Sequence, residues 1–347
     1  MPIRGVASPS PIELIRQPGR MPRALVATAE ASPNIALVKY WGNRDDVLRL
    51  PSNGSISMTL GGLRTVARVA FDPAATVDTL VIAGKVASPG ARQRVAQQLD
   101  LVRAAAGHDL KARIDSSSNF PSGAGIASSA SAFAAITMAA AAACGMALDA
   151  AALSRLARRG SGSACRSVWG GFVEWIAGDG DESSYAIPLA PAEHWPLIDL
   201  VAVVSQAPKS TGSTEGHRLA ASSPLQSARV ADTPRRLSAC RQALLERDFA
   251  GLSEVVELDS LMMHAVMMTS SPALVYWEPS TLTVLHAVAE WRREGHEVCA
   301  TVDAGPNVPC PCAPGQASVI LSKLQDLPGV DLVFECPPGE PARLVPN

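Results

Sequence analysis

The chain has 347 residues, of which 47% are apolar and 18% are charged, so it has the composition of a globular protein with a substantial core and not of a disordered chain. Lys and Arg total 30 while Asp and Glu total 32, and this near balance gives no sign of a nucleic-acid or acidic-membrane partner. A phosphorylated small molecule needs only local positive charge and stays compatible with these numbers.

The cysteines and the apolar runs indicate a soluble cytoplasmic protein. Seven cysteines are irregularly spaced, and the pair Cys310 and Cys312 has no companion pair at zinc-binding spacing, so reduced thiols are expected. Residues 1–22 lack a continuous apolar segment and are expected to be an N-terminal extension, not a signal peptide. The apolar run from Ala130 to Leu148 is mostly alanine, which favours a buried helix over a membrane span.

The first 200 residues are predicted to alternate between strands and helices. Periodicity and Gly, Pro and Ser punctuation indicate, in chain order, a strand at about 23–31, a turn at 32–34, an apolar segment ending at residue 39, strands at 55–60 and 64–71, a helix at 86–107, a strand at 111–118, an alanine-rich helix from about residue 128, a helix at 149–160, and strands at 167–178 and 197–205.

The chain after residue 205 is predicted to be mostly helical. The pattern indicates helices at 227–249, 249–268 and 280–295, followed by strands at 297–305 and 329–335. We therefore place a domain boundary at about 195–206. The expected organisation is an extension at 1–22, an N-terminal domain at 23–200 and a C-terminal domain at 201–340.

The stretch NFPSGAGIASSASAF (119–133) combines small residues with the start of a helix. Small residues let backbone N–H groups approach an anion, and the first turn of a helix has unpaired N–H groups and a positive dipole end. Ser128 and Ser129 would lie in that turn. The stretch lacks the G-x-x-x-x-G-K-[ST] pattern of a Walker A loop. By itself, a capped helix after a turn is the commoner explanation.

A second small-residue stretch, RRGSGSACRSVWGG (158–171), alternates Gly and Ser beside Arg166. It would suit a second anionic group. The alternative is a Gly-rich connection with a surface arginine.

Two charged residues close apolar segments. Asp303 lies in TVDAGPN, where a strand end could present a reactive side chain, although a turn aspartate bonded to its own backbone is the alternative. Lys39 ends NIALVK, where a cation is unexpected unless it meets an anion. The alternative is a lysine that snorkels from a strand end.

Together these stretches resemble the GHMP kinase superfamily and, within it, the mevalonate diphosphate decarboxylases. The matching motifs are NIALVKYWG, LPSNGSISMTL, NFPSGAGIASSASAF, GSGSACRSVWGGFVEW and DAGPN, with looser matches in VVSQAPKSTGSTEG and HAVMMTSSPALVYW. The resemblance covers roughly residues 24–320, and several motifs in order are more specific than any one alone. Because the 119–133 loop occurs together with the other matching motifs, it is expected to hold ATP phosphates.

The resemblance implies an α+β GHMP kinase fold, with an N-terminal ribosomal-protein-S5-like α/β domain and a C-terminal ferredoxin-like α+β domain. It also implies a reaction in the mevalonate pathway of isoprenoid biosynthesis. ATP phosphorylates the tertiary 3-hydroxyl of a 5-phosphorylated mevalonate, the phosphate leaves, and the C1 carboxylate is lost as CO2. The implied cofactors are ATP and Mg²⁺ bridging its phosphates, with no protein-only metal site. A homodimer with no membrane or nucleic-acid partner is expected.

The same resemblance assigns roles to residues of this sequence. Asp303 would orient or deprotonate the hydroxyl, and Lys39 would keep Asp303 ionised and stabilise the transferred charge. Arg166 would grip the carboxylate with two parallel hydrogen bonds. The implied substrate-binding residues further include Tyr40, Asn43, Ser161, Gly162 and Ser163. The implied ATP-binding residues are Pro121, Ser122, Gly123, Gly125, Ser128, Ser129 and Ser213.

One position departs from the family pattern. The family reads K-Y-W-G-K-R-D, with the second lysine on the substrate diphosphate, whereas this chain reads KYWGNRD with neutral Asn43. Losing a charge-assisted contact costs about 1.5–3 kcal/mol of binding. We therefore expect a slight preference for mevalonate 5-phosphate, giving isopentenyl phosphate. The alternative is that Arg44 or Arg218 replaces the cation and that the diphosphate is used.

Other functions and structural roles remain as alternatives. A GHMP kinase that phosphorylates without decarboxylation is a second hypothesis, and a non-catalytic binding module is a third. His264 is expected to be a packed helix histidine rather than a ligand. Trp41 and Trp169 could equally wall the cleft or fill the core.

Overall fold

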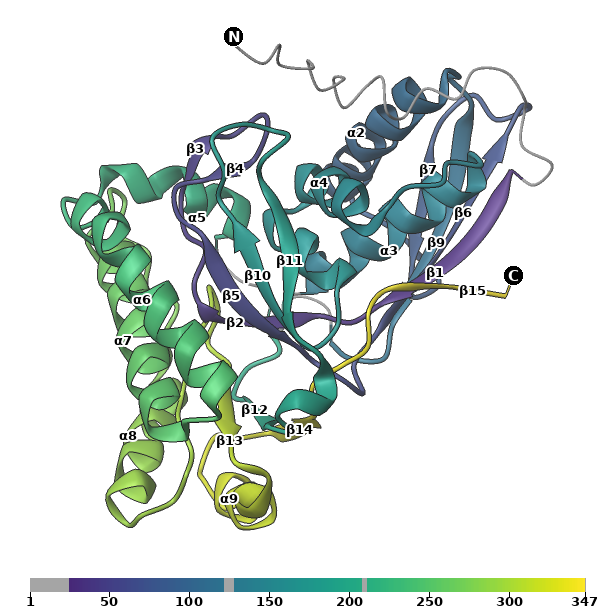
Figure 1. Ribbon diagram of the computed structural model, residues 1–347. Helices are drawn as coiled ribbons and strands as arrows, with labels where there is room; N and C mark the ends of the chain where they lie inside the picture. The colour runs from purple at the N-terminus through teal and green to yellow at the C-terminus, as the bar shows by residue number, and fades with distance from the viewer. Residues whose placement is uncertain (1–24, 122–127, 208–210, 347) are drawn as a thin grey trace, which may run out of the picture.

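The fold is a mixed α+β arrangement in which helices cover a large N-terminal sheet and a smaller C-terminal sheet (Figure 1). The computed structural model describes residues 25–121, 128–207 and 211–346. The expected extension at 1–22 lies outside these residues. No helix within the described segments is long and apolar enough to span a membrane.

A six-stranded sheet and three helices form the outer part of the N-terminal half. Its order is β15–β1–β6–β9–β7–β8, comprising β1 (Val26–Ala31), β6 (Thr65–Asp72), β7 (Thr79–Ile82), β8 (Lys85–Val86), β9 (Lys111–Ser118) and β15 (Arg343–Val345). The helices α2 (Pro89–Ala106), α3 (Ser128–Ala143) and α4 (Ala150–Gly160) share its core. The alanines of α3 are mostly buried, so the expected buried helix is confirmed.

The ends of α2 show why the sequence predicted this helix well. The Ser88 hydroxyl accepts a hydrogen bond from the Ala91 amide, Pro89 occupies the first turn, and Gly107 adopts the left-handed conformation at φ 77°. These are the start and stop signals that helices use.

A four-stranded sheet lies between the outer N-terminal layer and the C-terminal half. Its order is β11–β10–β5–β2, comprising β2 (Asn34–Val38), β5 (Ser55–Thr59), β10 (Phe172–Ile176) and β11 (Tyr185–Ala190). Beside it are the β3 (Asn43–Asp45) and β4 (Leu50–Pro51) pair and the 3-10 helix η1 (Gly162–Val168). This sheet shares a core with two long helices, α6 (Gln226–Glu246) and α7 (Phe249–Met268).

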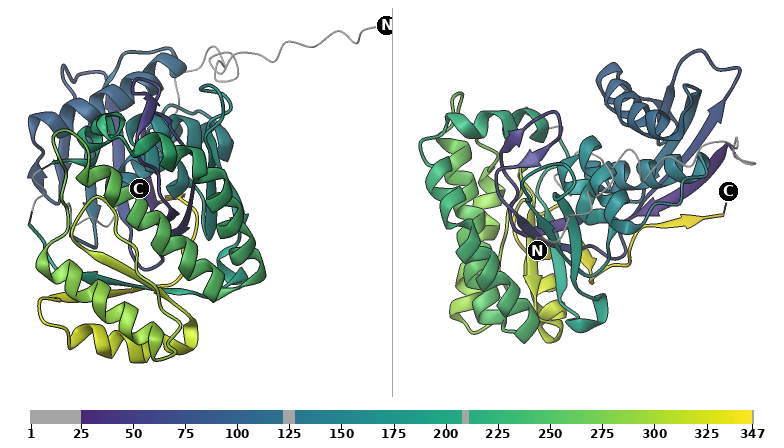
Figure 2. Two further views of the ribbon diagram at one scale, coloured as in Figure 1. Left: turned by 90° about the vertical axis from the view of Figure 1, so that its left-hand side faces the viewer. Right: turned by 45° about the horizontal axis from the view of Figure 1, so that its top comes forward.

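The C-terminal half is built on a three-stranded sheet. Its order is β13–β12–β14, comprising β12 (Ile198–Val203), β13 (Val308–Cys312) and β14 (Leu332–Cys336), and it shares a core with α8 (Pro279–Arg293) and α9 (Ala317–Gln325). The remaining short elements are α5 (Ser213–Leu219), η2 (Ala192–His194), η3 (Ala220–Ser222) and η4 (Pro314–Gln316). Figure 2 shows α6 and α7 flanking the four-stranded sheet from one side.

The strand predicted at 297–305 is wrong as a regular strand. The segment runs beside β13, and the amides of Cys299 and Thr301 donate to the carbonyls of Pro311 and Pro309 at 2.9 and 3.0 Å. Both prolines lack an N–H group, so they cannot donate back at these positions. A bond in the opposite direction forms only at the end of the segment, where the Ala313 amide donates to the Glu297 carbonyl at 3.0 Å, and no regular two-way ladder results among the described residues.

Candidate active site

A pocket of about 640 Å³ gathers polar residues from both halves of the chain. It is lined by the end of β2 and the residues after it, by η1, by the starts of α3 and α5, and by the loop that follows the 297–301 segment. Lys39, Arg166 and Asp303 lie around it together. Lys39 and Asp303, which are 264 positions apart in the sequence, thus meet in one place.

The centre of the pocket is an ion pair between Lys39 and Asp303. Lys39 Nζ donates to Asp303 Oδ1 at 2.6 Å, and the lysine side chain is buried while that of the aspartate is 24% exposed. A buried ammonium requires a partner. The second oxygen of Asp303 is therefore the one that can face an incoming hydroxyl while Lys39 holds the first.

Arg166 is a buried cation with neutral partners. Its guanidinium donates to Asn34 Oδ1 at 3.0 and 3.1 Å and to Ser55 Oγ at 2.6 Å. No carboxylate of the described residues lies within 4.0 Å of it. Burial lowers the pKa of Arg166, and the nearby Cys165 and Asp303 partly offset that effect. Because a buried charge is costly without a counter-ion, an anion in the pocket would complete this site.

The starts of two helices line another side of the pocket. Ser128 and Ser129 open α3 and line the pocket, and Ser129 Oγ lies 3.3 Å from Ser161 Oγ at the end of α4. Ser213 opens α5 and also lines the pocket. Pro121 directly precedes the part of the loop that lies outside the described residues, which contains the expected Ser122, Gly123 and Gly125.

Aromatic rings form one wall. The ring of His217 stacks on Tyr40 at 4.1 Å between centroids and is tilted against Trp41 at 4.5 Å. The Gly42 amide donates to His217 Nδ1 at 3.0 Å, and burial lowers the pKa of His217 to about 3. The imidazole is therefore neutral, with its proton on Nε2. Gly162 lies below Tyr40, close enough that a Cβ would be 2.5 Å from Tyr40 Cε1.

Asn43 is not among the residues that line the pocket. It accepts a hydrogen bond from the Tyr40 hydroxyl, and its Nδ2 donates to Asp46 Oδ1 at 2.7 Å. The sequence reasoning linked this position directly to substrate phosphate. The structure instead connects it to the pocket through Tyr40 and, by way of Asp46, through Arg218, whose Nε lies 3.8 Å from Asp46 Oδ2.

Besides Arg166, three arginines line the pocket: Arg49, Arg94 and Arg218. Arg44 does not, because it is exposed and donates to the carbonyls of Ala177 and Gly178. Sequence reasoning missed Arg49 and Arg94 because neither lies in a motif. Of these three arginines, the sequence analysis named only Arg218, as a possible replacement for the lysine that Asn43 lacks.

The structure also shows where Trp41, Trp169 and His264 lie. Trp41 is 2% exposed and also lines the pocket, so it is both core and wall. Trp169 donates to the Ala186 carbonyl at 2.7 Å and does not line this pocket. His264 is a buried helix histidine, as expected, and its Nε2 is 3.1 Å from the Val302 carbonyl.

No cluster of three or more His, Cys, Asp or Glu side chains that could hold a metal occurs in the part of the chain that the structure describes.

Comparisons with known proteins identify the family. Residues 31–186 match the diphosphomevalonate decarboxylase-like N-terminal domain, and residues 199–328 match the mevalonate 5-diphosphate decarboxylase C-terminal domain. The diphosphomevalonate decarboxylase of Candida albicans is 38% identical over 299 residues, which cover 81% of this chain and 82% of that protein.

Solved structures agree with this match. The mevalonate diphosphate decarboxylase from Staphylococcus aureus has a TM-score of 0.88 and 35% identity over 92% of this chain and 98% of its own. A structure titled "MDDEF in complex with MVAPP, AMPPCP and Magnesium" has a TM-score of 0.88 and 33% identity over 93% of this chain and 99% of its own. The chain therefore belongs to the diphosphomevalonate decarboxylase family and has its GHMP kinase fold. The expected family, fold and enzyme class are confirmed, whereas the slight preference for the monophosphate finds no support, because these relatives are named for the diphosphate.

Proposed function

We propose that this protein is an ATP- and Mg²⁺-dependent mevalonate 5-diphosphate decarboxylase that produces isopentenyl diphosphate. The observation that carries the proposal is the buried Arg166 without a carboxylate partner, in the same pocket as the Lys39–Asp303 pair and the start of α3. A substrate that carries both a carboxylate and a hydroxyl matches this arrangement. The names of the relatives support the choice of substrate.

The residues suit a two-step reaction. Asp303 accepts the proton of the 3-hydroxyl as its oxygen attacks the γ-phosphorus of ATP, and Lys39 stabilises the charge nearby. The C3–O bond to the new phosphate then breaks. The C1–C2 bond electrons form the C2=C3 double bond, and C1 leaves as CO2. Arg166 holds the carboxylate at a fixed angle throughout, since a guanidinium fork orients a carboxylate better than a point charge.

ATP is proposed to bind with its phosphates at the start of α3, where Ser128 and Ser129 lie. A helix start favours anions through its unpaired N–H groups and its dipole. Mg²⁺ fits best as an ion carried by the phosphates, because the described residues offer no carboxylate cluster for it. The similar structure of MDDEF in complex with MVAPP, AMPPCP and magnesium supports this pairing.

The diphosphate is favoured over the monophosphate by the arginines of the pocket. Arg49 and Arg218 line it, so the neutral Asn43 does not leave the site short of positive charge. Each charge-assisted contact contributes about 1.5–3 kcal/mol, enough to replace the missing lysine. We propose that Arg49 and Arg218 face the terminal phosphate of the substrate.

The test is to measure ADP and CO2 release with mevalonate 5-phosphate and mevalonate 5-diphosphate in parallel, with ATP and Mg²⁺. We expect kcat/KM to be roughly tenfold or more higher for the diphosphate. Arg49→Gln should reduce that preference, while Asp303→Asn should abolish turnover of both substrates. A preference for the monophosphate would overturn the substrate assignment, and ADP release without CO2 would establish a kinase instead.

Two broader expectations belong with this proposal. We propose a homodimer, which the mass of the protein in solution would test. A cytoplasmic location is proposed because the seven cysteines are free thiols, six of them buried. Fractionation of cells that express the protein would test that location.

A further inference from the structure

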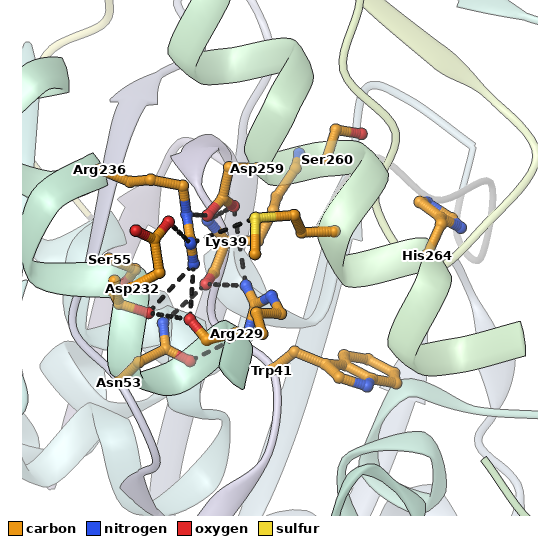
Figure 3. Close-up of polar contacts among 12 residues, drawn as sticks. Lys39, Trp41, Asn53, Ser55, Arg229, Asp232, Arg236, Asp259, Ser260 and His264 are labelled. Carbon is orange, nitrogen blue, oxygen red and sulfur yellow. Dashed lines mark hydrogen bonds and ion pairs between the residues drawn. The ribbon is translucent and has the colours of Figure 1, made fainter. Parts of the chain in front are cut away.

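The helix α7 contacts the backbone beside both members of the Lys39–Asp303 pair. Figure 3 shows Asp259 of this helix beside Lys39, together with Arg229 and Arg236 of α6, and His264 farther along the same helix. Lys39 comes from the N-terminal half and Asp303 from the C-terminal half, so their separation depends on how the two segments are held. The hydrogen bonds from α7 to both segments hold them relative to each other.

On the Lys39 side, both backbone polar groups of the lysine are fixed by buried side chains. The Lys39 amide donates to Asp259 Oδ2 at 2.6 Å. The Lys39 carbonyl accepts from Arg229 and from Asn53 Nδ2, each at 2.9 Å. Asp259 is itself held by Arg236 Nε at 2.7 Å. These charged groups are almost fully buried, so their hydrogen bonds lack competition from water.

On the Asp303 side, α7 binds the residue immediately before the aspartate. The Val302 amide donates to Ser260 Oγ at 2.9 Å, and His264 Nε2 donates to the Val302 carbonyl at 3.1 Å. Burial lowers the pKa of His264 to about 4, so the ring is a neutral donor at this carbonyl. Adjacent side chains of one helix thus hold the backbones of two segments that are distant in sequence.

We propose that Asp259, Ser260 and His264 are positioning residues that set the contact between Lys39 and Asp303, an inference that rests on the proposed function of that pair. A helix is stiff, and both anchor points lie within two turns of α7. Small displacements of a reacting group have large consequences, since a shift of about 1 Å can cost roughly a hundredfold in rate. The helix therefore contributes to turnover without touching substrate.

The test compares two substitutions of His264 with a control on an exposed helix face. His264→Leu removes the donor to Val302 while preserving bulk, His264→Gln restores a donor, and His286→Leu alters an exposed histidine of α8. For His264→Leu we expect kcat to fall by about tenfold to a hundredfold, with the KM values for both substrates within about threefold of the unsubstituted enzyme. His264→Gln should recover most of kcat, and His286→Leu should leave it unchanged.

Amide hydrogen exchange of the segment around Val302 gives a second readout that needs no activity. It should be faster in His264→Leu and near normal in His264→Gln. If His264→Leu does not fold, Ser260→Ala takes its place, with Ser260→Thr as the conservative partner and the same expectations.

The outcomes separate this inference from the proposed function. A lower melting temperature with unchanged kcat would mean that His264 is only structural, and would overturn the positioning role while Asp303→Asn stays inactive. Turnover that survives Asp303→Asn would overturn the assignment of the pair and, with it, this inference. Loss of kcat in His264→Leu that His264→Gln does not restore would also contradict it.

Discussion

The guanidinium of Arg166 is held by two neutral side chains, Asn34 and Ser55. We predict from this arrangement how replacing Arg166 changes decarboxylation. Arg166→Lys keeps the positive charge but loses the planar fork. We expect kcat/KM for decarboxylation to fall by about a hundredfold or more, because one or two charge-assisted hydrogen bonds of about 1.5–3 kcal/mol each are lost. The KM for ATP should change little. Parallel assays of ADP and CO2 would check this, and an equal loss of ATP affinity would contradict a role at the carboxylate.

Individual site residues were predictable from sequence only where they lie in a motif. Lys39 and Asp303 attracted attention because a charge closes an apolar segment, and the structure joins them at 2.6 Å. His217 and Arg49 carried no such signal. Each lies beside the pocket because α5 and the β3–β4 pair fold over Tyr40. This tertiary arrangement cannot be predicted from the local sequence pattern.

At the scale of elements, the packing of η1 beneath Tyr40 depends on Gly162. A Cβ at this position would lie 2.5 Å from Tyr40 Cε1, so Gly162→Ala must displace the ring or the 3-10 helix. We expect the KM for the phosphorylated substrate to rise about tenfold and the protein to lose about 1–3 kcal/mol of stability. Steady-state kinetics and thermal melting would measure both. Gly180→Ala is the matched control, because nothing lies within 4 Å of its added Cβ, and equal effects of the two substitutions would contradict the prediction.

The long helices were predicted more accurately than the strands of the C-terminal half, for a physical reason, whereas the short α5 and α9 were not predicted. The ends of α2 are specified locally by Ser88, Pro89 and Gly107, whereas strand pairing depends on distant partners. Residues 298–302 are mostly apolar and all buried, as in a buried strand, yet Pro309 and Pro311 deny this segment a full ladder. The return of β15 to pair with β1 was likewise invisible, because its three residues carry no long-range signal.

For the molecule as a whole, the central strand of the C-terminal sheet carries a buried carboxyl group that is unusual in a sheet core. Asp199 lies on β12, is fully buried, and has no hydrogen bond of normal geometry to either carboxylate oxygen among the described residues. Burial raises its pKa to about 7 from 3.8, and Lys39 and the Cys310 amide only partly offset that effect. Folding therefore favours the protonated acid, in a strand that pairs with both β13 and β14.

The sign of the resulting pH dependence follows from this raised pKa. Well below pH 4 the carboxyl is protonated whether the chain is folded or unfolded, so it does not oppose folding. As the pH rises toward 7, only the unfolded chain ionises freely, and the folded state loses up to about 4 kcal/mol of relative stability. Asp199→Asn should remove this loss, so its stability relative to the unsubstituted protein should increase from pH 4 to pH 8. Urea unfolding at several pH values would measure the difference, with the exposed Asp179→Asn as control. A difference that stays constant with pH would show that Asp199 remains ionised in the fold, and that the sheet tolerates a buried charge.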